Sequence, residues 1–287
     1  MFLVACAETA DVHDTNPAQG KVQFASLDSD GMFGAPKMID GYLYRPALGG
    51  PRPAIVFLHG CGGLIRSSGK LDSGEVDWAK RLSAAGYVVL LVDSYTTRGV
   101  KTMCAPANFQ ISVYHARQKD MYGALRYLQS LSFVRPDRIG VMGWSLGGGT
   151  ILTAIRDSGS LGRPGDLPQG DFRAAVAFNP ATCDTRVANT GWTSQIPLLV
   201  LVGDADVWTP AAPCKIMVDL AASKGSPSAI HIYPGAYHAF DSPNLPRQEH
   251  PEYRTSAGVV PIMGTDPAAR ADALERVPAF LGSYLND

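Results

Sequence analysis

The chain has 287 residues, 46% of them hydrophobic, which is enough to bury one large core. Its 25 basic and 26 acidic residues give a formal net charge of −1 and form no long run of one sign, which argues against nucleic acids and anionic membranes as partners. No stretch approaches 18 uninterrupted apolar residues and no repeat of fixed period occurs, so the sequence predicts neither a membrane-spanning helix nor a solenoid.

The start of the chain carries a short motif. Residues 3–6 read Leu-Val-Ala-Cys and resemble the lipobox of bacterial lipoproteins, in which cleavage precedes the cysteine and Cys6 would be lipidated. On this interpretation residues 1–20 are a tail left from a lipoprotein signal, the protein is exported or lipid-anchored, and residues 21–287 form a single domain. A cytoplasmic protein with a frayed apolar end is the alternative, because MFLVAC is too short for a secretory signal and lacks a positive charge.

Strand and helix patterns alternate along the rest of the chain. An antiparallel strand pair at a sheet edge is predicted at residues 21–27 and 38–44. Short runs rich in Val, Ile and Leu predict strands buried on both faces at residues 54–58, 87–92, 139–142, 174–178, 197–202 and 229–233. Helical periodicity occurs at residues 76–85, 116–131, 146–156, 213–224 and 268–285. This pattern predicts an α/β fold, a doubly wound and mostly parallel sheet of about eight strands with helices on both faces. Ligand chemistry is then expected where the strands end.

Two segments show neither period. Residues 159–171 are rich in glycine and proline, and residues 241–266 are long and polar. Loops of this length in a compact domain are usually functional or mobile. Both segments are therefore predicted to be surface loops that form walls or lids of a site.

The five cysteines lack the C-x-x-C spacing of zinc and redox sites, so no metal or other cofactor is predicted. If Cys6 is a lipid site, four cysteines remain. Cys183 and Cys214 would flank one strand and its following loop, and Cys61 with Cys104 is the other candidate pair. Two disulfides in an oxidising compartment and four buried thiols in a cytosolic enzyme are both open, because spacing does not test disulfide geometry.

Ser145 lies between a predicted strand and a predicted helix, in the sequence Gly143-Trp144-Ser145-Leu146-Gly147. This is the context of a nucleophile elbow, in which a sharp turn exposes the serine and small residues on either side let strand and helix approach. The helix would also point its N-terminus, with its unpaired N–H groups, at developing negative charge. A glycine-rich turn with an inert serine is the alternative, whereas a phosphate-binding loop would need lysine where Gly149 precedes Thr150.

A serine nucleophile needs a base, and three histidines follow it in the chain. His231 lies inside a predicted strand, and His250 lies in a polar loop with no strand to orient it. His238 comes just after the final predicted strand, on a glycine-containing loop. We therefore expect His238 to be the general base.

The carboxylate that orients the base is expected after the strand at residues 197–202, where Asp204 and Asp206 follow. Asp204 comes directly after Gly203 and is expected to bond backbone N–H groups of the turn. Asp206 lies further out and is the predicted partner of the imidazole. Serine, aspartate and histidine then occur in the chain order of α/β-hydrolases.

An oxyanion needs hydrogen-bond donors, and the glycine-rich turn FLHGCGGL after the third strand lies at the same edge of the sheet. The backbone N–H of Cys61 is the predicted first donor, and that of Leu146, directly after the nucleophile, is the second. His59 is expected to support this turn through hydrogen bonds and not to take part in catalysis.

Together these motifs resemble the dienelactone hydrolase branch of the α/β-hydrolase superfamily, from about residue 41 to residue 285. The resemblance rests on the order and spacing of HGCGG, VDSYTTRG, RIGVMGWSLGG, GDADVWTP and YPGAYHAFD. It implies an α/β-hydrolase fold, these triad positions and ester cleavage without a cofactor. It also implies that Asp93, Arg98, Arg117 and Asp120 brace loops near the site.

One residue departs from the family pattern, because dienelactone hydrolases carry cysteine at the elbow and this chain has Ser145. The serine moves the expected substrate from dienelactones towards simple esters. GWSLGGG is also similar to the elbow of cutinase-like polyester hydrolases. Three aromatic residues flank the triad and would either line an acyl pocket or pack in the core: Trp144, Trp208 and Tyr237.

The resulting prediction is a serine hydrolase that cleaves carboxylic esters through an acyl-enzyme intermediate. A cutinase-like polyester hydrolase, a peptidase of the prolyl oligopeptidase type and a non-catalytic binding protein on the same fold are the alternatives. The sequence indicates a small-molecule ester as partner and leaves the oligomeric state open.

Overall fold

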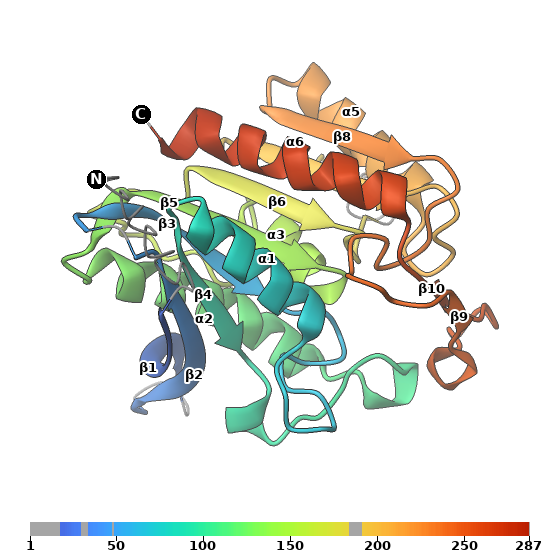
Figure 1. The fold of residues 1–287 in the computed structure, drawn as a ribbon, viewed down its shortest axis with the longest axis horizontal. Coiled ribbons are helices and arrows are strands. Elements are labelled where there is room, and N and C mark those ends of the chain that lie inside the picture. The colour runs from blue at the N-terminus through green and yellow to red at the C-terminus, as the bar shows by residue number, and fades with distance from the viewer. Residues whose placement is uncertain (1–17, 30–33, 48, 184–190, 287) are drawn as a thin grey trace, which may run out of the picture.

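The computed structural model describes residues 18–29, 34–47, 49–183 and 191–286, which form a central eight-stranded sheet covered by helices (Figure 1). The strands lie in the order β1-β2-β4-β3-β5-β6-β7-β8. β1 and β2 pair antiparallel, β2 pairs antiparallel with β4, and all further neighbours are parallel. The strand bounds are β1 Ala18–Ser29, β2 Pro36–Arg45, β3 Arg52–Leu58, β4 Val88–Asp93, β5 Val134–Trp144, β6 Ala174–Phe178, β7 Leu198–Gly203 and β8 Ser228–Tyr233.

The short apolar runs become strands because both faces of the sheet are buried. In β3, Ala54, Val56 and Leu58 pack into the hydrophobic cluster on one face. Ile55 and Phe57 alternate with them and pack into the cluster on the other face. A strand that points side chains alternately to two buried faces reads as a continuous apolar run. The predicted strand pair and the six predicted buried strands are confirmed, with small shifts at their ends.

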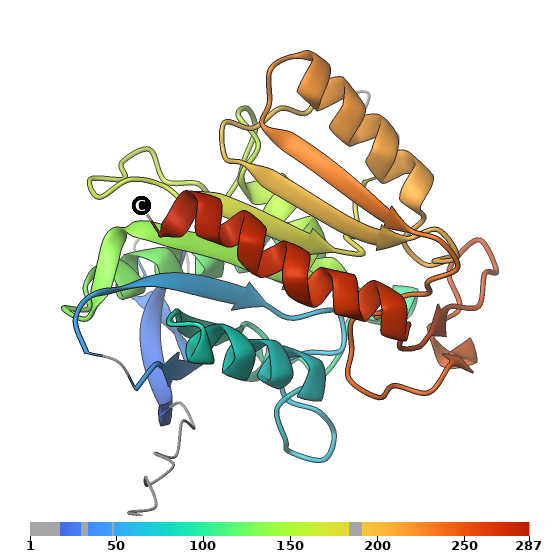
Figure 2. The ribbon, with the colours of Figure 1, turned by 45° about the horizontal axis from the view of Figure 1, so that its top comes forward.

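Helices cover the two faces separately (Figure 2). Helices α1 (Ser73–Ala84) and α6 (Pro267–Leu285) bury Trp78 and Leu281 in one cluster. The opposite cluster receives side chains from α2 (Ile111–Gln129), α3 (Leu146–Ala154) and α5 (Ala211–Ser223). The five predicted helices are thus present, and α2 begins five residues before its apolar periodicity indicated.

The long segment 241–266 is more ordered than its sequence indicates. It contains the paired strands β9 (Gln248–Glu249) and β10 (Ile262–Met263) and a short 3₁₀ helix at Pro251–Tyr253. Strands of two residues bury too little surface to produce a hydrophobic period, so the sequence could not reveal them.

Both candidate cysteine pairs form disulfides, Cys61–Cys104 and Cys183–Cys214. Disulfides are compatible with an oxidising compartment. The lipobox-like residues 3–6 lie outside the described residues, as does most of the predicted tail 1–20. Within the described part of the chain, no helix has the length and apolar character needed to cross a membrane.

The start of α3 lies directly against the end of β3. A Cβ atom added at Gly147 would lie 2.0 Å from the carbonyl oxygen of Leu58 and 2.8 Å from that of His59. A Cβ atom added at Gly143 would lie 2.7 Å from the carbonyl carbon of Gly147. Only glycine permits this approach, so the first turn of α3 packs against the carboxyl ends of β3 and β5.

We predict that Gly147→Ala lowers the free energy of unfolding by about 3 kcal/mol or more, because backbone atoms would have to move to admit the methyl group. Urea denaturation followed by circular dichroism measures this. Gly282→Ala in α6 is the matched control, since its added Cβ would meet side-chain atoms and no backbone, with the Asn286 amide at 3.1 Å and the Tyr87 hydroxyl at 3.8 Å. Alanine is the better helix former by about 1 kcal/mol, so the control is expected to be neutral or stabilising. Equal stability of the two variants would contradict the close-packing argument.

Candidate active site

Ser145 occupies a strained turn between β5 and α3. Its backbone has φ 51° and ψ −114°, a conformation that residues other than glycine rarely adopt. The Ser145 N–H donates to the Phe178 carbonyl at 2.8 Å, and its own carbonyl accepts the N–H of Gly149 at 2.9 Å. Because glycines at 143 and 147 let the turn close, Ser145 is presented at the carboxyl edge of the sheet. This is the backbone geometry of a nucleophile elbow.

Asp206 and His238 meet at the same edge, after β7 and β8 respectively. The Asp206 Oδ2 atom lies 2.7 Å from His238 Nδ1, and both side chains are buried. Asp206 Oδ1 accepts the N–H groups of Trp208 and Thr209, each at 2.9 Å, and the Thr209 hydroxyl donates to Oδ2 at 2.7 Å. Burial alone would raise the pKa of Asp206, but His238 and the donors of Thr209 hold that pKa below its ordinary value. The carboxylate is therefore charged and has a fixed orientation.

The other candidate acid and bases have different surroundings. Asp204 Oδ1 accepts the N–H of Gly235 at 2.6 Å, the turn-stabilising contact expected of it. His231 lies in β8, 3.9 Å from Asp272. His250 was expected to lack a strand that orients it, and this was wrong, because β9 precedes it and its side chain lines the pocket around Ser145. Its Nδ1 atom lies 2.9 Å from the carboxylate of Glu252.

The predicted oxyanion turn lies beside the serine. A Cβ atom added at Gly60 would be 3.7 Å from the Cβ of Ser145. Cys61 is bonded to Cys104, and its carbonyl accepts the N–H of Met103 at 2.8 Å. Leu146 opens α3, where the helix dipole and unpaired N–H groups favour negative charge. The roles of Cys61 and Leu146 as N–H donors stay predictions.

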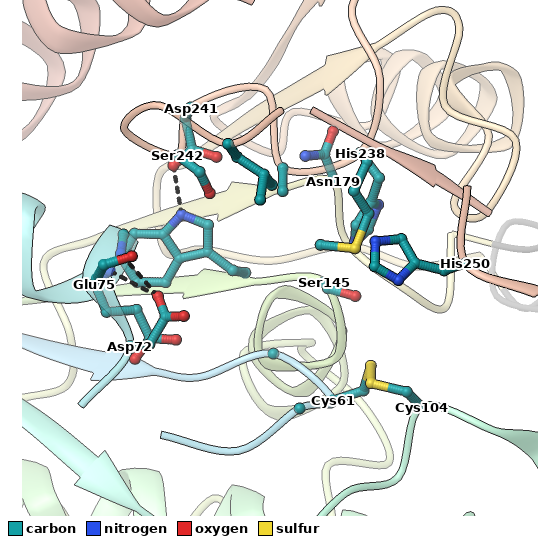
Figure 3. A pocket seen from close by; sticks show the side chains of 18 of the residues that line it. Cys61, Asp72, Glu75, Cys104, Ser145, Asn179, His238, Asp241, Ser242 and His250 are labelled. Atoms are coloured by element: carbon teal, nitrogen blue, oxygen red, sulfur yellow. Dashed lines mark hydrogen bonds between the residues drawn. A yellow bond between two sulfur atoms is a disulfide. The ribbon is translucent and has the colours of Figure 1, made fainter. Parts of the chain in front are cut away.

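A cavity of about 390 Å³ is lined by Ser145, His238 and Cys61, among other residues. In Figure 3, Ser145 lies between His238 on one side and the Cys61–Cys104 disulfide on the other. Segment 241–266 supplies the largest share of the wall, as expected for one of the two long loops. Segment 159–171 contributes none of the described residues that line the cavity, so its expected role as a wall or lid is not supported. The wall residues from the contributing segment are Asp241, Ser242, Pro243, Asn244, Leu245, Gln248, His250, Tyr253 and Met263.

Two of the three aromatic residues that flank the triad line the cavity. Trp144 and Trp208 are part of its wall. The Trp208 ring lies 4.9 Å from the His238 ring and stacks on Tyr253 at 5.5 Å. Tyr237 is not among the described residues that line the cavity, because its ring lies against the guanidinium of Arg247, 4.3 Å away. The expected substrate contact of Tyr237 therefore has no geometric support.

Sequence reasoning missed two buried carboxyl groups in the wall, Glu75 and Asp241. Asp241 Oδ2 accepts the indole N–H groups of Trp78 at 2.9 Å and of Trp144 at 2.7 Å. Burial raises the pKa of Asp241 despite these donors. Burial, reinforced by the nearby charge of Asp72, raises the pKa of Glu75 well above its usual range. Glu75 comes from α1, far from any motif, and no sequence signal indicated it.

The four residues expected to brace nearby loops are engaged as follows. Arg98 pairs with Asp120 at 2.8 Å and with Asp28 at 3.1 Å. Asp93 accepts the N–H groups of Tyr95 and Thr96 at 3.2 and 3.1 Å. Arg117 donates to the carbonyl of His59 and, at 3.1 Å, to the hydroxyl of Tyr95.

Several known proteins are similar to this chain. The chain is 28% identical over 208 residues to a Bradyrhizobium protein described as a probable 2-oxo-3-(5-oxofuran-2-ylidene)propanoate lactonase, covering 69% of this chain and 77% of that protein. It is 29% identical over 241 residues to the quorum-quenching protein AidA of Acinetobacter baumannii, covering 83% of this chain and 72% of AidA. Among solved structures, the dienelactone hydrolase-like promiscuous phosphotriesterase P91 from metagenomic libraries superposes with a TM-score of 0.64 at 18% identity, covering 93% of this chain and 99% of that one.

The model of one protein family matches residues 39–285, which include the turn at Cys61, the strand-to-helix turn at Ser145, and the segments that carry Asp206 and His238. The fold is that of the α/β-hydrolases, as the eight-stranded sheet and the superposition agree. The chain is therefore a member of the dienelactone hydrolase family.

Proposed function

We propose that this protein is a serine hydrolase that cleaves uncharged carboxylic esters or lactones through Ser145, His238 and Asp206. The observation that carries the proposal is the buried 2.7 Å contact between Asp206 and His238, because His238 lines the same cavity as Ser145. A buried carboxylate on Nδ1 leaves Nε2 of His238 free to take a proton. Membership of a hydrolase family supports the same conclusion.

The reaction proceeds in two acyl-transfer steps. His238 Nε2 takes the hydroxyl proton of Ser145 as its Oγ attacks the ester carbonyl, and the N–H groups of Cys61 and Leu146 stabilise the oxyanion. Asp206 stabilises the imidazolium. The imidazolium then protonates the leaving alcohol as the C–O bond breaks, which leaves an acyl-serine. Water, deprotonated by His238, attacks the acyl-serine and releases the acid and free Ser145.

Charge in the cavity favours an uncharged substrate. Arg66 is the only lysine or arginine among the described residues that line it, and Asp72 already neutralises it with an ion pair. Glu75 and Asp241 add two further carboxyl groups to the wall. The Bradyrhizobium relative is described as acting on a lactone that carries a carboxylate. This cavity provides no free cation for such a group among its described residues, so a neutral ester or lactone fits it better.

Ser145→Ala is expected to lower kcat/KM for a short p-nitrophenyl ester by at least about 10³-fold, because removal of a nucleophile abolishes acyl transfer. A fluorophosphonate should add one label to the wild type and none to the variant, as measured by intact mass. Hydrolysis within about tenfold of wild type, or labelling of the alanine variant, would refute the role of Ser145.

Asp206→Asn is expected to lower kcat by about 10⁴-fold, because asparagine favours the wrong imidazole tautomer. Asp204→Asn is the matched control at the end of the same strand. It removes a charge from a turn contact with Gly235 and should keep kcat within about tenfold of wild type. If the control loses as much activity as Asp206→Asn, the assignment of the acid is wrong.

Substrate charge is tested with two lactones of equal ring size, one neutral and one bearing a carboxylate. We expect kcat/KM to be at least about tenfold higher for the neutral lactone, a difference of about 1.4 kcal/mol. Asp72→Asn keeps an N-cap for α1 while it frees the charge of Arg66, so it should raise kcat/KM for the anionic lactone and leave the neutral one unchanged. A wild-type preference for the anionic lactone would exclude this substrate class.

A further inference from the structure

The peptide between Gly60 and Cys61 carries the predicted oxyanion donor, and its carbonyl accepts a hydrogen bond from His59. His59 Nδ1 lies 2.7 Å from the Gly60 carbonyl oxygen. A carbonyl oxygen only accepts, so Nδ1 carries the proton. In a trans peptide the N–H points away from the C=O. This contact therefore directs the Cys61 N–H away from the His59 ring. Gly60 and Cys61 line the cavity and His59 does not, so the N–H is directed to the cavity side.

His59 is in turn held by Arg117 of α2. The Arg117 guanidinium donates to the carbonyl of His59 and to the hydroxyl of Tyr95, and the Tyr95 ring meets the His59 ring edge-on at 4.4 Å. Burial and the charge of Arg117 lower the pKa of His59 well below its usual range. The imidazole is therefore neutral, with Nδ1 protonated and a buried Nε2 that has no hydrogen-bond partner in the described structure.

Arg117 is unusual because its charge is fully buried without an ion pair. Its side chain has no exposed surface, and no described carboxylate lies within ion-pair distance of it. Its Nε atom also lacks a hydrogen-bond partner among the described residues. Glu75 interacts electrostatically with this charge but forms no ion pair with it, so the buried charge is only partly compensated and is costly to bury. Arg98 shows the ordinary arrangement of a buried arginine, with ion pairs to Asp28 and Asp120.

We propose that Arg117 is a positioning residue for the reaction, which acts through His59 to orient the Gly60–Cys61 peptide so that its N–H faces the developing oxyanion. The disulfide to Cys104 and the Met103 N–H hold the other side of the turn. Because glycine at position 60 gives the peptide freedom to rotate, its orientation depends on these contacts. The inference rests on the proposed serine hydrolase function.

The test compares Arg117→Met, which removes both charge and donors, with Arg117→Lys, which keeps the charge and one donor. Oxyanion contacts act in the transition state, so kcat should fall and KM should not. We expect Arg117→Met to lower kcat about 10- to 100-fold with KM within about threefold, since one lost oxyanion donor costs about 10²- to 10³-fold. Arg117→Lys should recover kcat to within about fivefold of wild type.

Arg98→Met is the structural control, because it breaks buried ion pairs that do not touch the oxyanion turn. It should lower Tm at least as much as Arg117→Met and keep kcat within about twofold. If Arg117→Met does not fold, the comparison of His59→Leu with His59→Asn tests the inference instead. The asparagine amide can still donate to the Gly60 carbonyl, and leucine cannot. The leucine variant should then lose kcat and the asparagine variant should retain most of it.

Unchanged kcat in Arg117→Met, or equal kcat in His59→Leu and His59→Asn, overturns the inference and leaves the serine hydrolase proposal intact, provided that Ser145→Ala is inactive. Equal loss of kcat in Arg117→Met and Arg98→Met also overturns it, because the effect would then be general destabilisation. A wild type without Ser145-dependent hydrolysis overturns both proposals.

Discussion

The contact between the first turn of α3 and the end of β3 determines the geometry of the site. Gly147 lies so close to the carbonyls of Leu58 and His59 that no side chain fits between them. This contact brings the N-terminus of α3, and with it Ser145, next to the turn that follows β3. Ser145 and the turn that carries Cys61 are therefore coupled through this packing, which is what electrostatic preorganisation of the proposed site requires.

Two buried charges of the candidate site are compensated in different ways. The Asp206 carboxylate accepts two backbone N–H groups and a hydroxyl, and His238 lies against it. Arg117 has only neutral oxygen acceptors, a carbonyl and a hydroxyl. Burial of an ion costs several kcal/mol before compensation. The well-compensated Asp206 carboxylate lies beside His238, where an imidazolium would form. The poorly compensated Arg117 guanidinium lies behind the turn where negative charge would develop. Both arrangements would favour charge separation during the proposed acyl transfer.

Substrate choice depends on a different part of the molecule. The elements that carry Ser145 and His238 belong to the α/β framework, and many chemistries are built on such frameworks. The cavity wall comes largely from segment 241–266 and from α1, which contributes Glu75. Asp241 joins the two, because it accepts hydrogen bonds from Trp78 of α1 and from Trp144 at the elbow. Changes in this segment can therefore alter specificity while the framework stays the same.

The sequence alone determined the order of strands and helices, the elbow at Ser145 and the pairing partners Asp206 and His238. These features depend on local sequence, since a glycine-flanked turn, a buried strand and a polar residue at a strand end each produce a pattern within a few positions. Both disulfides were candidates from sequence, but only the fold could bring their cysteines within bonding distance. Thr209 was within reach of the same reasoning, because it lies three residues after Asp206 in a turn where hydroxyls commonly bond.

The cavity wall was decided by the tertiary structure alone. Tyr237 neighbours His238 in the chain, yet its ring lies against Arg247. His250, which was expected to lack a strand that orients it, lines the cavity. Glu75 reaches the backbone of Gly60, in the turn that carries Cys61, from a helix with no motif. Where a side chain points in a loop, and which distant groups it meets, depends on packing between segments that share no sequence period. Contacts of that kind form only when the whole chain is folded, so the sequence predicted the reacting groups and the fold determined their surroundings.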